Sequence, residues 1–430
     1  MSPQETLRVI MRLPTPLLRH AYAHHPLLPL LLRECRDLPS ARNELRWLAE
    51  YATTAACGRR WGWISKSKSK TGLRRGDDTR LRLHEMIKQR AQGVPLQYIL
   101  GDAPFGSVEV LCERGVLVPR PETESLTTHT ATLLLSTLLP SQSQPKTQPP
   151  TLRIIDLCTG TGCIPLLLHA LLAPSFPRLA IYGVDISTRA LSLARRNLVH
   201  NLRLGTVGER ARGEVRFLRG DVLGTESTGV GGEVKGIEAL FPDMGASEDT
   251  NTNNPSEPAD RPPTHSEIST TTTTNNNDKN TITILISNPP YISPAQFRNG
   301  TTARSVRRFE PRLALVPPPL SLSAVDGLGG AGAVRREDVF YHRILKFAGG
   351  EGVRAELVVM ECGDRGQAGR VRGVAEEMEG GKMEGEVEVE VWGCEGDGSG
   401  SGMGRVSDGD GEEEGARGVV VRRGVFRRSV

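Results

Sequence analysis

A glycine-rich turn between an apolar strand and an apolar helix limits the fold of this chain more than any other feature. Residues 152–156 have the composition of a buried strand, and the turn 157–163 separates them from the apolar stretch 164–172. Gly160 and Gly162 would let a ligand approach the backbone closely, beside the free N–H groups of the next helix. This order predicts an α/β fold with a ligand site at the turn.

The acidic residues that end the next strands extend this interpretation. A second apolar strand, 179–184, ends at Asp185, which lies 29 residues after Asp156. An α/β nucleoside site places the carboxylate that binds ribose hydroxyls at about this distance, although Asp185 is also a candidate N-cap of a helix over 188–201. The strand 215–219 is followed by Asp221, which would face an adenine amino group or cap a turn. The turn lacks the third glycine of a dinucleotide fingerprint and the Gly-Lys-Ser/Thr of a phosphate loop.

The tetrapeptide Asn288-Pro289-Pro290-Tyr291 follows the apolar run 282–287. An Asn side-chain oxygen and the carbonyl of the next Pro can each accept one N–H of an NH2 group, which orients a poorly nucleophilic planar nitrogen for methyl transfer. The two prolines stiffen the turn, and Tyr291 offers a flat face for stacking. The alternative is a strand that ends in an ordinary proline turn.

Four further strings carry a resemblance to a known family. They are Val-Pro-Leu-Gln-Tyr-Ile-Leu-Gly at 94–101, Val-Pro-Arg-Pro-Glu-Thr-Glu at 118–124, the segment 307–315, and the strand with its glycine at 357–363. Together with the two motifs above, they resemble the release-factor glutamine methyltransferases, which use S-adenosylmethionine to methylate the Gln of the Gly-Gly-Gln loop in peptide-chain release factors. Many methyltransferases carry Asn-Pro-Pro-Tyr, but few carry the second string.

The resemblance implies an α/β fold, with a Rossmann-like S-adenosylmethionine-dependent methyltransferase domain, a small N-terminal helical domain and a linking β-hairpin. The expected boundaries are 1–93 for the helical substrate-recognition domain, 94–119 for the hairpin and 120–430 for the methyltransferase domain. The implied cofactor-binding residues are Asp156, Cys158, Thr159, Gly160, Thr161, Gly162, Asp185, Asp221, Val222 and Asn288. The implied catalytic residues are Asn288, Pro289, Pro290 and Tyr291, and Phe105 is a candidate for the pocket wall.

The sequence departs from the family at a few positions. Cys158 stands where bacterial members usually carry Gly, and Asp397 and Arg417 are the nearest matches to the closing motif. The alternatives are a methyltransferase for an exocyclic amino group of a nucleic-acid base, which would need to flip the base, and a non-catalytic S-adenosylmethionine-binding module. We expect a release factor, alone or at the ribosome, as the partner and no nucleic-acid substrate.

Three polar segments are expected to be disordered inserts, at about 140–150, 224–280 and 393–415. Each lacks the apolar residues that could offset the entropy of ordering. Basic residues cluster in 59–90. This cluster is expected to be either a solvated face or a contact with RNA or a release factor. The net charge of +4 is too small to indicate a nucleic-acid enzyme.

The remaining signals concern metals, redox state and location. The seven cysteines form no C-x-x-C pair and no zinc-ligand spacing, so we expect reducing surroundings and no metal. No apolar stretch reaches the roughly 18 residues of a membrane span, so we expect no membrane insertion. The arginines and the scarcity of acids before Glu34 fit a mitochondrial presequence or the first helices of the N-terminal domain, with Ser40 as a helix cap. The expected location is mitochondrial, with the cytoplasm as the alternative.

Overall fold

The computed structural model describes residues 13–56, 75–139, 148–224, 234–241, 280–319, 334–349, 353–380, 387–394, 403–405 and 416–427. The chain divides into two compact units. The first comprises Met1–Pro104, Glu109–Pro119 and Pro294–Ala314, and the second comprises Phe105–Val108, Arg120–Ser293 and Leu315–Val430. The boundaries 1–93, 94–119 and 120–430 remain predictions.

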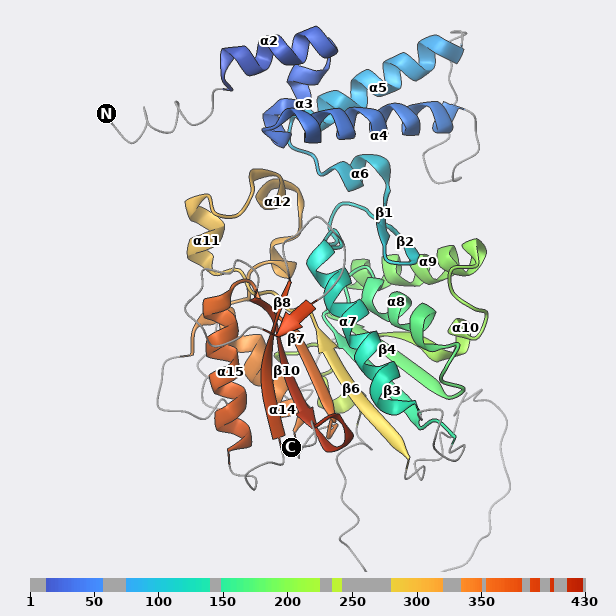
Figure 1. The fold of residues 1–430 in the computed structure, drawn as a ribbon, viewed down its shortest axis with the longest axis vertical. Helices are drawn as coiled ribbons and strands as arrows, with labels where there is room; N and C mark the ends of the chain where they lie inside the picture. Colours follow the sequence, from blue (N-terminus) through green and yellow to red (C-terminus); the bar gives the residue numbers. More distant parts are fainter. Residues whose placement is uncertain are drawn as a thin grey trace, which may run out of the picture. The chain divides into compact units, whose positions relative to one another are not determined.

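The first unit is mostly helical (Figure 1). Its helices are α2 (Thr15–His24), α3 (Leu28–Cys35), α4 (Leu38–Ala56), α5 (Arg75–Ala91), α6 (Leu96–Leu100), α11 (Pro294–Asn299), α12 (Arg304–Phe309) and the 3-10 turn η3 (Arg312–Ala314). Apolar residues at helical spacing, such as Leu28, Leu31 and Leu32, form its core. The prediction that Ser40 caps the fourth helix is wrong, because α4 begins at Leu38 and the Asp37 carboxylate accepts the Ser40 N–H at 2.7 Å.

The second unit contains one eight-stranded sheet with the order β5-β4-β3-β6-β7-β10-β8-β9. The strands are β3 (Thr151–Leu157), β4 (Leu179–Asp185), β5 (Val215–Arg219), β6 (Thr281–Ser287), β7 (Leu357–Glu361), β8 (Val387–Cys394), β9 (Met403–Arg405) and β10 (Ala416–Arg423). The first five strands of this order are parallel, whereas β10 runs antiparallel to both β7 and β8. This topology confirms the predicted Rossmann-like α/β fold. The expected hairpin is also present, as β1 (Asp102–Phe105) and β2 (Val108–Leu111).

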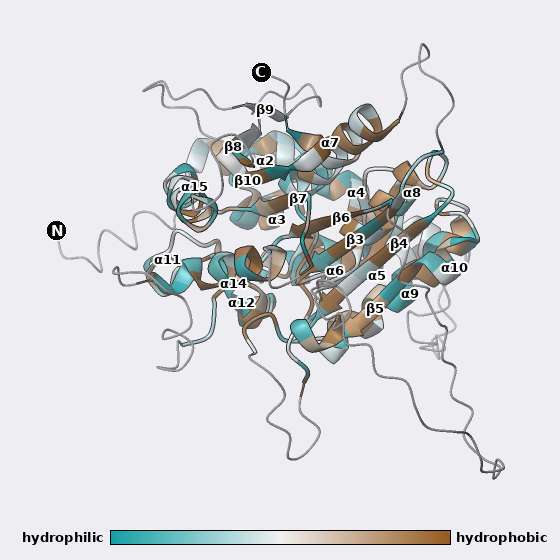
Figure 2. Cartoon of the chain, turned by 90° about the horizontal axis from the view of Figure 1, so that it is seen from below, coloured by the Kyte–Doolittle hydropathy of each residue, from teal (hydrophilic) through white to brown (hydrophobic). Residues whose placement is uncertain are grey.

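Helices cover both faces of the sheet (Figure 1). They are α7 (Pro121–Leu138), α8 (Cys163–Leu172), α9 (Thr188–Leu204), α10 (Ala211–Glu214), α14 (Val339–Ala348) and α15 (Arg365–Glu379), with the 3-10 turns η1 (Glu238–Leu240), η4 (Arg336–Asp338) and η5 (Gly424–Phe426). Alternate strand residues, such as Ile155 and Leu157, share a core with α14 and α15. Figure 2 shows the central strands β3, β4 and β6 mostly in hydrophobic brown, as expected for strands covered on both sides.

The order in which successive strands are added to the sheet reverses at β3, which makes β3 the topological switch point. β4 pairs with one side of β3 and β6 with the other, so connections leave the centre in opposite directions. In open α/β sheets, ligands bind outside the carboxyl ends of the strands at this point. The ends of β3, β4 and β6 are therefore where a site is expected.

The expected insert 224–280 is not entirely outside the fold. The described segment 234–241 forms a bridge between Gly236 and Asp221, and Ile237 and Phe241 are buried in the same core as α14. Phe241 also meets the Tyr182 ring edge-on at a centroid distance of 5.6 Å. The prediction that this whole stretch stays unpacked is wrong for these residues, because two apolar side chains suffice to bury a short segment. β9 likewise lies within the expected insert 393–415 and pairs with β8.

Several predictions fall on residues outside the described ranges. These are the start of the candidate presequence (1–12), the basic residues 59–74, Asp397, and most of the three expected inserts. Within the described ranges, no helix is long and apolar enough to cross a membrane. The same residues contain no cluster of His, Cys, Asp and Glu suited to a metal ion.

Candidate active site

The glycine turn after β3 has a tightly fixed backbone. Cys158, Gly160 and Gly162 all have positive φ, at 65°, 55° and 79°. The Thr159 N–H donates to the Val184 carbonyl at 3.0 Å, and the Gly162 N–H donates to the Thr159 carbonyl at 2.9 Å. The turn is therefore bound to the end of β4 and leads directly into α8.

The two glycines of the turn have different surroundings. A Cβ on Gly162 would lie 2.9 Å from the Phe217 ring and 3.0 Å from the Ala194 Cβ, so this glycine allows close packing within the protein. A Cβ on Gly160 would have one neighbour within 4 Å, the Cys158 carbonyl oxygen at 4.0 Å. Space therefore remains open over Gly160 for a ligand to approach the backbone.

Asp185, the last residue of β4, holds this turn. Its Oδ2 accepts the Gly160 N–H at 2.9 Å, and its Oδ1 accepts the Ser187 N–H at 2.8 Å. Ser187 is the N-cap of α9, since its hydroxyl oxygen accepts the Ala190 N–H, so the capping role considered for Asp185 belongs to Ser187. Burial raises the pKa of Asp185, and the backbone N–H groups of Ser187 and Gly160 oppose that rise.

Two polar side chains at the turn, those of Asp156 and Thr159, are buried. Among the described residues, the two carboxylate oxygens of Asp156 and the hydroxyl of Thr159 have no hydrogen-bond partner. Burial raises the pKa of Asp156 well above its usual value, the nearby Thr159 hydroxyl opposes the rise, and the Asp185 carboxylate adds to it. Buried polar groups are normally paired, so groups left without a partner beside an open turn fit a polar ligand.

The other predicted cofactor residues make contacts within the protein, and their place in a cofactor site stays a prediction. Thr161 is buried, and its carbonyl accepts the Asn197 amide N–H at 2.9 Å. The Asp221 Oδ1 accepts the Leu223 N–H at 2.9 Å, which is the turn-capping alternative for this residue. Val222 is buried in the core beside α14.

Asn288 stands directly after β6 and is tied to a chain of hydrogen bonds. Its Nδ2 donates to the Thr123 Oγ1 at 2.9 Å, and the Thr123 hydroxyl donates to the Glu361 Oε2 at 2.6 Å. The Tyr291 hydroxyl donates to the other carboxylate oxygen of Glu361 at 3.3 Å. One buried carboxylate at the end of β7 therefore connects both ends of the Asn-Pro-Pro-Tyr segment.

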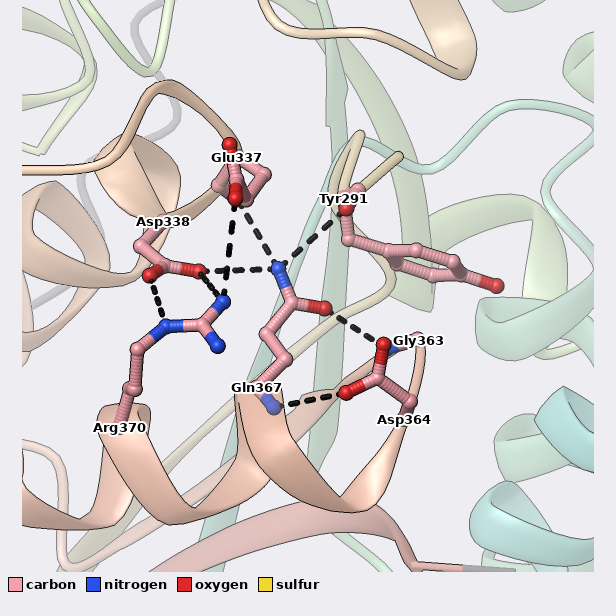
Figure 3. Close-up of polar contacts among 7 residues, drawn as sticks. All are labelled: Tyr291, Glu337, Asp338, Gly363, Asp364, Gln367 and Arg370. Atoms are coloured by element: carbon pink, nitrogen blue, oxygen red, sulfur yellow. Dashed lines mark hydrogen bonds and ion pairs between the residues drawn. The ribbon is translucent and has the colours of Figure 1, made fainter. Parts of the chain in front are cut away.

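The main chain of Tyr291 is fixed by Gln367 from α15 (Figure 3). The Gln367 Nε2 lies 3.3 Å from the Tyr291 carbonyl oxygen and 3.0 Å from Asp338 Oδ1, and its Oε1 accepts the Gly363 N–H at 2.8 Å. A Cβ on Gly363 would lie 2.9 Å from the Tyr291 ring, so glycine makes room for the aromatic side chain. Pro289 and Pro290 are buried. The whole turn is thus held in one conformation.

The sheet brings the two constellations together. Leu157 at the end of β3 is in register with Ser287 at the end of β6, and the Ser287 hydroxyl donates to the Leu157 carbonyl at 2.8 Å. Cys158 and Asn288 therefore follow neighbouring strands at the same edge. Phe105 is buried in the second unit, where a Cβ on the adjacent Gly106 would lie 2.7 Å from Leu167. Its place in a pocket wall stays a prediction.

Sequence reasoning missed Thr123, Glu361 and Gln367 as members of the site. Thr123 and Glu361 lie inside two strings that carry the family resemblance, 118–124 and 357–363. A signal for Glu361 was available, since an acid that ends a wholly apolar strand is unusual in a core. Gln367 gives no such signal, because a Gln in the first turn of a helix is ordinary.

Comparisons with known proteins identify relatives over most of the chain. It is 30% identical over 306 residues to the mitochondrial MRF1 N(5)-glutamine methyltransferase MTQ1 of Saccharomyces cerevisiae, covering 71% of this chain and 68% of that protein. It is 29% identical over 360 residues to the probable MRF1 mitochondrial N(5)-glutamine methyltransferase mtq1 of Schizosaccharomyces pombe, covering 83% and 87%. It is also 32% identical over 233 residues to the release factor glutamine methyltransferase of Chlorobaculum tepidum, covering 54% and 55%.

No protein-family model matches the chain. Among solved structures, the N-terminal domain of human METTL16 in complex with SAH is similar with a TM-score of 0.36 and 14% identity, over 79% of this chain and 83% of that one.

Proposed function

This chain belongs to the release factor glutamine methyltransferases, and from that premise we propose that it methylates the side-chain amide nitrogen of the Gln in the Gly-Gly-Gln loop of a release factor. The observation that carries the proposal is the position of Asn288, at the end of β6 and beside the glycine turn of β3. Its amide is held through Nδ2 by Thr123, so Oδ1 remains to accept a hydrogen bond.

The Asn-Pro-Pro-Tyr turn binds the substrate amide, which is the methyl acceptor. Asn288 Oδ1 and the Pro289 carbonyl accept the two N–H groups of the substrate amide, which holds the nitrogen toward the donor. These oxygen dipoles also stabilise the positive charge that develops on nitrogen in the transition state. Tyr291 stacks against the planar amide group, and Pro290 keeps the turn rigid.

The proposed methyl donor is S-adenosylmethionine, which supplies an electrophilic methyl group on a sulfonium sulfur. The residues proposed to hold it are the turn 158–162 with Asp156, the acid Asp185, and the pair Asp221 and Val222. The open space over Gly160 and the unpaired carboxyl of Asp156 support this assignment. The Asp185 carboxylate would exchange part of its present bonding for ribose hydroxyls.

The alternatives considered from the sequence are less well supported. The relatives are named for glutamine methylation of a protein, which favours a protein amide over an exocyclic base amine. We propose that the partner is a release factor and that nucleic acid is not a substrate. Because both yeast relatives carry mitochondrial names, we propose a mitochondrial location, with the cytoplasm as the alternative.

The test is incubation with labelled S-adenosylmethionine and purified release factors, followed by mass spectrometry of the acceptor. Methylation should fall on the Gln of the Gly-Gly-Gln loop, and a factor with Glu at that position should remain unmodified, because a carboxylate cannot donate to both oxygens of the site. Methyl transfer to tRNA, ribosomal RNA or DNA with none to a release factor would overturn the proposal in favour of a base methyltransferase.

The Asn288→Ala variant tests the role of the side chain itself. It should abolish methylation while donor affinity, measured by calorimetry, stays within about tenfold, because the lost oxygen serves mainly the reacting amide. Retained turnover would remove Asn288 from the proposed role.

A further inference from the structure

We propose that Thr123 and Glu361 fix the orientation of the Asn288 side-chain amide. Its oxygen then faces the substrate amide, so the site selects amides over carboxylates. This inference rests on the proposed function and assigns two positioning residues to it. Thr123, near the start of α7, bonds Asn288 directly, and Glu361, at the end of β7, acts on Asn288 through Thr123.

The direction of the hydrogen bonds carries the inference. A hydroxyl has one proton to donate, and Thr123 gives it to the Glu361 Oε2 over 2.6 Å. The Thr123 oxygen can then only accept from Asn288, which it does from Nδ2 at 2.9 Å. Asn288 therefore turns its NH2 toward α7 and leaves its oxygen for the site.

Burial makes this arrangement costly to reverse. Thr123 is 3% exposed and Glu361 is 1% exposed, so water cannot replace a lost partner for either side chain. If the Asn288 amide flipped, its oxygen would face the Thr123 oxygen, and Thr123 would have to withdraw its proton from Glu361. The buried carboxylate would then lose its 2.6 Å hydrogen bond from Thr123, and losing a bond to a buried charged group costs free energy.

The carboxylate itself is held in place from a second direction. The Tyr291 hydroxyl donates to Glu361 Oε1, and the buried Tyr341 hydroxyl donates to the Glu361 carbonyl at 2.8 Å. The end of β7 therefore cannot shift to follow a flipped amide. Asn288 is left with one orientation, in which an acceptor NH2 is attracted and an acceptor carboxylate is repelled.

The test compares Thr123→Val, which keeps the side-chain shape without the hydroxyl, with Thr123→Ser, which keeps the hydroxyl. Thr130→Val is the matched control, since Thr130 is also buried in α7 and its hydroxyl donates only within the helix, to the Leu126 carbonyl. For each protein, kcat, KM, donor affinity and the relative affinity for release factors with Gln or Glu in the loop are measured.

Thr123→Val should lower kcat about tenfold or more and leave donor affinity within about twofold. Its preference for the Gln-containing factor over the Glu-containing one should fall to within about threefold, because a freely rotating Asn288 can donate to a carboxylate. Thr123→Ser and Thr130→Val should keep the wild-type kcat and preference. A merely structural role would lower melting temperature without changing the preference.

An active wild type combined with unchanged kcat and preference in Thr123→Val would overturn the inference. A wild type that methylates no release factor would instead refute the proposed function, so the two failures are distinguishable. If Thr123→Val does not fold, Thr123→Ala removes the same hydroxyl without adding volume, and the same two readouts decide the question.

Discussion

The two glycines of the turn after β3, where we propose that the donor binds, should respond differently to the same substitution. Gly160 and Gly162 both have positive φ, so an Ala at either position strains the backbone by about 1–2 kcal/mol. Their surroundings differ, since a Cβ meets only a carbonyl oxygen at 4.0 Å over Gly160 but meets Phe217 at 2.9 Å over Gly162. The pair therefore separates a glycine needed for the ligand from one needed for packing.

The expected magnitudes follow from this geometry. For Gly160→Ala, the backbone strain is partly offset by the smaller entropy of the unfolded chain, about 0.4–1 kcal/mol, so the free energy of unfolding should fall by about 1 kcal/mol. For Gly162→Ala, overpacking against Phe217 and Ala194 adds about 1–3 kcal/mol. The second variant should thus be less stable than the first by about 1–3 kcal/mol.

Donor binding should show the opposite order. Gly160→Ala places a methyl group in the open space over the turn and should weaken donor affinity by more than about tenfold in calorimetry, while urea unfolding shows a stability loss of only about 1 kcal/mol. Gly162→Ala should show its main effect in the unfolding transition. Normal donor affinity in Gly160→Ala, or equal stability losses in the two variants, would refute this reasoning.

Three further predictions concern the acids of the turn and the long insert. Asp185→Ala should weaken donor binding by about 1.5–3 kcal/mol in calorimetry, and unchanged affinity would leave this acid with a purely structural role. Burial raises the pKa of Asp156, so its protonated form favours the folded state, and this stabilisation is lost as pH rises from the unfolded-state pKa, about 4, through the folded-state pKa. The melting temperature of Asp156→Asn relative to wild type should therefore increase from about pH 4 upward. A constant difference would contradict this. Replacing 242–279 by a short Gly/Ser linker should leave melting temperature and activity nearly unchanged, whereas deleting 225–279, which also removes the buried Phe241, should lower the melting temperature markedly.

The parts of the site that were predictable from sequence are those encoded locally. The strand and glycine turn before α8 follow from apolar runs and two glycines, and the acid that ends β4 follows from its position after a strand. The Asp185 carboxylate was expected either to bind a ligand or to cap α9. The chain order Asp185-Ile186-Ser187 permitted both, and the structure gives the cap to Ser187 because it directly precedes the helix.

The hydrogen bonds that hold Asn288 were not predictable in the same way. Thr123 and Glu361 are 238 positions apart, and no periodicity links the first turn of α7 to the last residue of β7. The burial of Ile237 was missed for a related reason, since its segment is surrounded by polar sequence, and the core that it joins is built from residues far away along the chain, such as those of α14 and the sheet. Contacts of this kind depend on the tertiary fold and leave no local pattern.

The donor and acceptor sides of the site therefore tolerate change differently. The glycine turn after β3 depends on backbone conformation, and Cys158 has a positive φ at a position where the family resemblance leads one to expect glycine. A left-handed residue with a Cβ costs about 1–2 kcal/mol, but the Cys158 side chain packs against the core and offsets part of that cost. The acceptor side depends on side chains of three separate elements with a fixed direction of hydrogen bonding. A single change of residue type at Thr123 would break that direction, whereas the glycine turn holds Cys158, a residue with a Cβ, at a positive φ.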